Sequence, residues 1–186
     1  MISKICGIDY SMNSPGLCVY STEDRSKPIT FQLCQSYFFT TKKKFAKDFG
    51  NNIHGVLQPE WGCPEQRFDQ LSDLLMPIIE GATLCFLESY SYGSHGKIFE
   101  IAENTAILKY KLYKKSCPFN TISPMSVKKF ATTKGNADKK MMIDVFCKTQ
   151  DFDIRKIMGC GDVSPLADVV DSYFLLAAGI SRLKTA

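Results

Sequence analysis

The feature that most limits how this chain can fold is a short apolar segment near its start that ends in a carboxylate. Residues 5–8 form an apolar run of the length of one β-strand, and Asp9 follows it directly. A polar turn over residues 11–16 leads into a second apolar run over 17–20, which predicts two neighbouring strands. A carboxylate at the end of a buried strand costs free energy unless it is paired or binds a cation. Asp9 is therefore either a residue that hydrogen-bonds the turn or one member of a larger site.

Three more carboxylates occur in similar surroundings. A short apolar run over residues 83–87 ends in Glu88, and the last expected helix begins with Asp168 and Asp171 in an otherwise apolar or small-residue segment. Their i, i+3 spacing places the two aspartates on one helix face, about 5–6 Å apart at Cβ. Acids in a first helical turn also gain about 0.3–1 kcal/mol from the helix dipole, so simple capping is the alternative explanation. If the four acids meet, they cannot all stay ionised without a cation, and Mg²⁺ or Mn²⁺ is the natural partner of such oxygen ligands.

The remaining pattern predicts a mixed α/β domain over residues 1–186. A third strand is expected over 29–39, where it continues an antiparallel meander, and a brief strand over 119–122. Helices are expected over residues 65–80, 97–115, 125–132, 137–149 and 166–183. Asn136 is the expected cap of the fourth helix, and Ser-Pro pairs at 123–124 and 164–165 open the third and fifth. Residues 40–64 lose all periodicity, which is typical of a functional or mobile connection, and 151–161 are expected to be irregular.

Composition narrows the class of protein. The eight cysteines are scattered without a Cys-x-x-Cys pair and only two histidines are present, which argues against a structural zinc site and favours a reducing, intracellular compartment such as the cytoplasm. No apolar run approaches the roughly 20 residues that span a bilayer, so no membrane partner is expected. The net charge of +4 is mild, but lysines cluster at 42–47, 109–115 and 128–140, a distribution compatible with nucleic-acid binding.

In their order along the chain, these motifs resemble the RNase H-like nucleases and, more narrowly, the RuvC-type Holliday junction resolvases. That family places an Asp on its first strand, a Glu on its fourth and an Asp-x-x-Asp on its last helix, positions matched here by Asp9, Glu88, Asp168 and Asp171. Residues 134–142 are similar to the family's glycine, acid–lysine and helix motif. The lysine of that motif approaches the cleaved backbone and corresponds to Lys139.

The resemblance implies an RNase H-like fold with a mixed five-stranded sheet, three antiparallel N-terminal strands followed by parallel ones, flanked by helices. It implies a metal-dependent endonuclease that resolves four-way or branched DNA by paired nicks, using two Mg²⁺ ions (Mn²⁺ as the alternative) held by the four acids. A homodimer is expected, with the helix over 97–115 as the dimer element. The candidate DNA-binding residues are Lys134, Lys140, Tyr90, Tyr92 and Lys97. The expanded segments at 40–64 and 151–163 are more similar to viral or phage members.

Three alternatives remain open from the residues alone. One is another RNase H-like nuclease that acts on RNA–DNA hybrids, flaps or other branched DNA. A second is an actin-like ATPase, which shares the fold and an early Gly-x-Asp motif, although this chain is short for two such lobes and has no second glycine-rich phosphate loop. The third is a non-catalytic junction-binding protein, against which the acid set argues because concentrated negative charge repels phosphates.

Overall fold

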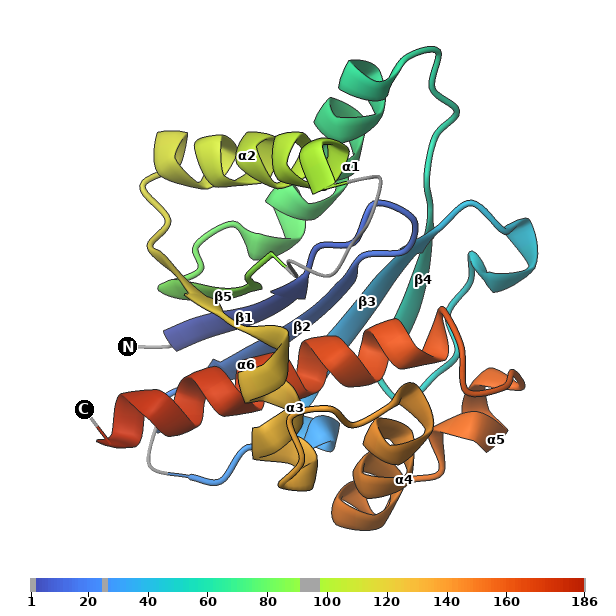
Figure 1. Cartoon of the computed structure of the whole chain (residues 1–186), viewed down its shortest axis with the longest axis vertical. Coiled ribbons are helices and arrows are strands. Elements are labelled where there is room, and N and C mark those ends of the chain that lie inside the picture. The colour runs from blue at the N-terminus through green and yellow to red at the C-terminus, as the bar shows by residue number, and fades with distance from the viewer. Residues whose placement is uncertain (1–2, 25–26, 91–97, 186) are drawn as a thin grey trace.

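A mixed β-sheet forms the centre of the molecule in the computed structural model, which describes residues 3–24, 27–90 and 98–185 (Figure 1). Within these residues the sheet has six strands in the order β4-β3-β2-β1-β5-β6. Strand β1 pairs antiparallel with β2 and parallel with β5, while β2–β3 is antiparallel and β3–β4 and β5–β6 are parallel. The strands are β1 (Ser3–Asp9), β2 (Gly16–Thr22), β3 (Cys34–Thr40), β4 (Ile53–Leu57), β5 (Leu84–Glu88) and β6 (Phe119–Ile122).

The helices cover the sheet from both sides, with α1 and α2 over one face and α3, α4, α5 and α6 over the other (Figure 1). They are α1 (Pro64–Ile79), α2 (Ile98–Lys114), α3 (Pro124–Thr132), α4 (Lys139–Gln150), α5 (Ile154–Met158) and α6 (Leu166–Thr185). Two short 3₁₀ turns, η1 (Phe31–Leu33) and η2 (Lys43–Phe45), flank β3. No helix in the described ranges is both long and apolar enough to cross a membrane.

Alternation along β1 explains why two layers of helices are needed. Cys6 and Ile8 belong to the apolar cluster shared with α1 and α2, whereas Ile5 belongs to the cluster shared with α6. Because successive strand residues point to opposite faces, an apolar residue at nearly every position requires cover on both sides. The buried strand that the sequence predicts is thus the centre of a three-layer α/β fold.

The expected α/β, RNase H-like architecture is confirmed, but the expected number of strands is wrong. The additional strand, β4, lies inside the 40–64 segment that lacks any periodicity, and it pairs parallel to β3 with Phe38 opposite Gly55. A Cβ at Gly55 would collide with the carbonyl oxygen of Phe45, so glycine allows β4 to lie directly against η2. Strand β3 also begins later than expected, because η1 occupies Phe31–Leu33.

Helix starts were predicted less accurately than the helices themselves. Ser123 caps α3 as expected, since its side chain accepts a hydrogen bond from the Ser126 N–H at 3.3 Å. The cap of α4 is Asp138, not Asn136, because the Asp138 carboxylate accepts from the Met141 N–H at 2.8 Å. The segment expected to be irregular contains the short helix α5.

Candidate active site

Parallel pairing of β1 with β5 brings the first two acids to one edge of the sheet. Ile8 lies opposite Leu87 in the register, so the following residues, Asp9 and Glu88, both leave the carboxyl end of their strands at the same level. A cavity of about 430 Å³ opens at this edge. Its lining includes Asp9, Glu88, Asp168, Asp171, Lys139, Tyr90 and the turn residues Ser11, Met12, Asn13 and Ser14.

Close glycine contacts place α6 so that its two acids reach this cavity. A Cβ on Gly16 would overlap the carbonyl oxygen of Asp168, and one on Gly7 would lie 2.6 Å from the backbone N of Leu176. Real Cβ atoms do not come so near, so α6 can lie against β1 and β2 only where these strands have glycine. The first turn of α6 therefore lies at the carboxyl end of β1, beside Asp9.

The four carboxylates make ionisation costly for one another. Burial raises the pKa of Asp9 well above its usual range, and the negative charges of Glu88, Asp171 and Asp168 raise it further. Burial, then the charge of Asp171, raises the pKa of Glu88 to about 7. Burial, then the charge of Asp168, raises the pKa of Asp171 to about 6. A site with this much opposed negative charge favours a bound cation.

Asp168 is the most enclosed acid of the four, with 4% of its surface exposed. Its Oδ1 accepts a hydrogen bond from the Ser164 hydroxyl at 3.0 Å, and its Oδ2 is buried without a hydrogen-bond partner in the part of the chain that the structure describes. Burial raises the pKa of this carboxyl as well. An unpartnered buried carboxylate oxygen is costly on its own and is the type of ligand that Mg²⁺ takes.

The four carboxylates are ligands of the type that binds a divalent cation. Their side chains, however, lie farther apart than the ligands of a formed metal centre. In the described ranges, no three His, Cys, Asp or Glu side chains lie close enough to hold one ion between them. Holding an ion would require these side chains to turn toward it.

Within the described residues, two lysines face the acids, and the sequence predicted only one of them. Lys139, the first residue of α4, lines the cavity, and its charge opposes the raised pKa values of Asp9, Asp168 and Asp171. Lys128 on α3 acts in the same way on the pKa values of Glu88 and Asp171. The sequence shows Lys128 only as one member of a lysine cluster, with no signal that distinguishes it from its neighbours.

The predicted DNA-binding residues fall into three groups. Tyr90 lines the cavity, and the Lys109 ammonium lies 4.7 Å from its ring centroid. Lys134 and Lys140 are exposed and lie outside the cavity lining, and Lys140 is paired with Asp144 at 2.7 Å. Tyr92 and Lys97 lie outside the described residues, so those two predictions stay untested.

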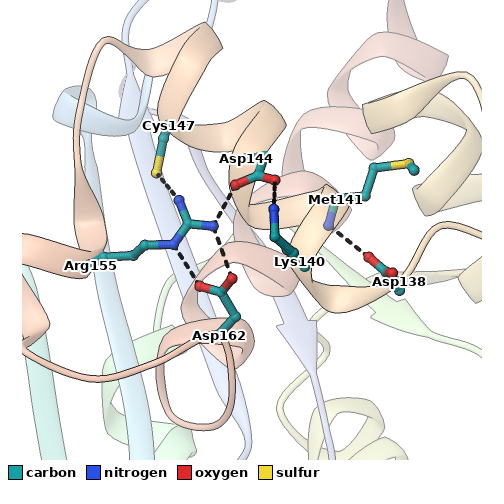
Figure 2. A network of polar contacts seen from close by, with 7 residues as sticks. All are labelled: Asp138, Lys140, Met141, Asp144, Cys147, Arg155 and Asp162. Atoms are coloured by element: carbon teal, nitrogen blue, oxygen red, sulfur yellow. Dashed lines mark hydrogen bonds and ion pairs between the residues drawn. The ribbon is translucent and has the colours of Figure 1, made fainter.

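An arginine-centred network joins α4 to the segment that precedes α6 (Figure 2). The Arg155 guanidinium donates to Asp162 through Nε at 2.6 Å and through Nη2 at 3.1 Å, and Nη2 also donates to Asp144 of α4. The same Asp144 carboxylate accepts from Lys140. This network fixes the start of α4, which carries Lys139, relative to the approach to Asp168.

The fold is the feature that this molecule shares with known proteins. It is the mixed-sheet, RNase H-like fold of the RuvC-type Holliday junction resolvases. No model of a known protein family matches the sequence, and no match is found among curated proteins.

Several solved structures are similar to this chain over nearly its whole length. RuvC from Thermus thermophilus aligns with a TM-score of 0.59 at 16% identity, over 100% of this chain and 98% of that one. The fowlpox virus resolvase in complex with its substrate Holliday junction DNA aligns with a TM-score of 0.54 at 17% identity, over 98% and 99%. The yeast mitochondrial Holliday junction resolvase Ydc2 aligns with a TM-score of 0.52 at 18% identity, over 98% and 81%. At these identities the likeness is one of fold.

Proposed function

We propose that this chain is a metal-dependent endonuclease that resolves four-way or branched DNA junctions. One observation carries the proposal: carboxylates from β1, β5 and α6 line a single cavity together with Lys139. The likeness in fold to enzymes described as Holliday junction resolvases, two of them solved with junction DNA, supports the choice of substrate. The raised pKa values of the acids support the choice of a divalent cation as cofactor.

In this proposal Asp9, Glu88, Asp168 and Asp171 would hold two Mg²⁺ ions, with Mn²⁺ as the alternative. Such ions, when bound, supply Lewis-acid activation for phosphodiester hydrolysis. The acids themselves present hard oxygen ligands from three elements, and the Ser164 hydroxyl orients one carboxylate of the set. Lys139 offsets negative charge on the scissile phosphate, and Lys128 offsets part of the charge of Glu88 and Asp171.

We also propose that the protein acts as a homodimer through α2. Leu108 and Leu112 bury one face of this helix against the rest of the protein. The opposite face carries Phe99, Tyr110 and Tyr113, which are 81%, 62% and 74% exposed. Large aromatic side chains on one helix face mark an interaction surface, and a two-fold dimer suits a substrate with two-fold symmetry in outline.

The decisive experiment is cleavage of a labelled four-way junction in Mg²⁺ by wild type and by Asp9→Asn. We expect wild type to nick the junction in pairs, and Asp9→Asn to bind the junction but lose cleavage by at least about 1000-fold, because the acid set then lacks one charge. Asp151→Asn, at an exposed position outside the cavity, is the matched control and should cut at the wild-type rate. Normal cutting by Asp9→Asn would show that the acids are not the active site.

A panel of RNA–DNA hybrid, flap, duplex and junction substrates separates the proposed activity from the other RNase H-like nucleases. We expect the junction to be cut most rapidly under equal conditions. If the RNA–DNA hybrid were cut fastest, the proposed junction substrate would be wrong, but the four acids would still be the proposed active site. Binding without cleavage in either Mg²⁺ or Mn²⁺ would instead favour a non-catalytic junction binder.

A further inference from the structure

A second hollow lies next to the candidate active site, at the segment that leads into α6. It is a groove of about 650 Å³, which we call the lysine groove. One wall comes from the segment around η2 and carries Lys42, Lys44 and Lys47, and the other is the backbone of residues 157–161 with Val163. Ser164 lines both this groove and the acidic cavity, so the two hollows adjoin at that residue.

The groove contains positive charge without internal compensation. Its lining includes three lysines and no carboxylate. No ion pair joins these lysines to an acid within the described ranges. The nearby Asp48 lies 3.3 Å from His54. Asp162, between two lining residues but not itself part of the lining, is paired with Arg155 at 2.6 Å (Figure 2). The positive electrostatic potential of the three lysines therefore favours binding of an anion in the groove.

Aromatic side chains lie beside two of the three lysines. The Lys44 and Lys47 ammonium groups lie 4.8 Å and 5.0 Å from the ring centroids of Phe45 and Phe49, and both rings pack against the core. Burial raises the pKa of the Cys160 thiol, and the charge of Lys44 opposes this rise, so the two walls face each other. These contacts favour positions of Lys44 and Lys47 along the groove wall.

The opposite wall is open to close approach by a backbone. A Cβ built on Gly159 or Gly161, two residues that line the groove, would meet no atom within 4 Å. An extended polyanion can therefore lie between the lysines and this bare stretch of chain. A small anion would need a tighter cradle than a groove of this size.

We propose that the lysine groove binds the phosphodiester backbone of the DNA arm that continues from the cleaved strand. This inference rests on the proposed function, because it extends the path of the same DNA past Ser164 and away from the acids. The groove then contributes to affinity for the DNA, while the chemistry stays with the acidic cavity.

The test measures binding of a labelled four-way junction as a function of salt, in Mg²⁺ and in an Asp9→Asn background that leaves the DNA intact. Removing all three groove lysines, Lys42→Ala with Lys44→Ala and Lys47→Ala, should weaken Kd roughly 30-fold near 0.15 M salt. The slope of log Kd against log salt concentration should fall by about 0.9 for each lost phosphate contact, or about 2.7 in all. With Asp9 restored, the cleavage rate at saturating enzyme should stay within about two-fold of wild type.

The matched control removes three exposed lysines elsewhere, Lys27→Ala, Lys148→Ala and Lys184→Ala, with the same change in net charge. It should keep a nearly wild-type salt slope. If both triple variants show equal affinity and slope, the groove does not bind DNA. That result would leave the proposed function intact if wild type still cuts the junction. If wild type does not cut the junction at all, the proposed function is wrong, and the binding measurements still decide whether the groove binds DNA.

A second pair of variants tests the opposite wall independently. Gly161→Glu adds a carboxylate to the groove, and Gly161→Gln adds a neutral side chain of the same size, with open space for either. We expect the Glu variant to bind junction DNA about 10-fold more weakly than the Gln variant because of its charge. Equal affinities for these two variants would also overturn the inference, even if the lysine variant failed to fold.

Discussion

Asp9 lies at the end of β1 and faces negative charge from the other three acids of the cavity. Its folded-state pKa lies above that of an unfolded Asp, so the folded state prefers the protonated form. Well below the unfolded Asp pKa of about 3.9, the group is protonated in both states and its ionisation has no effect on stability. As pH rises, the unfolded chain releases this proton first, and stability falls until the folded-state pKa is passed. Glu88 and Asp171, with pKa values of about 7 and about 6, add losses of the same sign.

Asp9→Asn should therefore stabilise the metal-free protein at high pH. In EDTA at pH 8 we expect a melting temperature about 4 °C above wild type, which for a chain of this length corresponds to about 1–2 kcal/mol. The gain should shrink at pH 5, where the wild-type carboxyl already holds more of its proton. Thermal unfolding followed by circular dichroism at both pH values measures it, with Asp151→Asn as the exposed control. A lower melting temperature for Asp9→Asn at pH 8 would contradict the repulsion argument.

Single residues also show what the sequence can and cannot reveal about the site. The four acids could be predicted because each follows or interrupts an apolar segment, a local pattern that burial makes costly. Lys128 could not, because its nearness to Glu88 and Asp171 depends on how α3 packs in the folded chain. Ser164 was predicted only as a helix-start residue, yet its hydroxyl donates to Asp168.

At the scale of elements, the seating of α6 on β1 and β2 decides whether the site forms. Gly16 is paired with Asp9 in the β1–β2 register and also touches the backbone at Asp168. One glycine thus controls the separation between the strand that provides an acid and the helix that provides two more.

Gly16→Ala should damage both stability and cleavage. The added methyl group meets backbone, which cannot rotate away, so we expect a loss of about 3 kcal/mol in the free energy of unfolding and a large loss of junction cleavage. Urea unfolding and the cleavage assay measure the two effects. Gly62→Ala is the control, because its nearest neighbour is the flexible end of Gln66 at 3.4 Å. A fully active, stable Gly16→Ala protein would show that the contact does not fix the helix.

Elements with strong periodicity were predicted well, and those specified by partners were not. The helix expected over 97–115 is observed as α2, Ile98–Lys114, because a stripe of apolar residues marks its buried face. Strand β4 was missed because five residues with a central glycine have no local strand signature and gain one only by pairing with β3. The cap of α4 is Asp138 and not the predicted Asn136. Both residue types are good caps, and which one caps the helix depends on the backbone conformation before α4, which the sequence alone does not specify.

At the scale of the whole molecule, the exposed aromatic face of α2 predicts assembly. Replacing Tyr110 and Tyr113 with Glu should convert a dimer into a monomer, because charges in an apolar contact must be desolvated without a partner. Sedimentation equilibrium over a range of concentrations measures the change. Phe130→Glu, at an exposed aromatic position on α3, is the control and should stay dimeric. A monomeric wild type would contradict the proposed assembly.

The glycine contacts of α6 have a consequence for how such a molecule can change over generations. Gly7 and Gly16 of the strands contact the helix backbone, and Gly179 of the helix contacts the Phe86 ring. If α6 slid along its axis by one residue, about 1.5 Å, a larger side chain would be forced into at least one of these contacts. The positions of Asp168 and Asp171 are thus determined by the packing of α6 on the sheet, and not by the length of the connection over 159–165. Insertions and deletions in that connection can reshape the wall of the lysine groove while Asp168 and Asp171 stay in place. Under the proposed function, the surface that selects a DNA substrate and the acids that cut it would then be able to change independently.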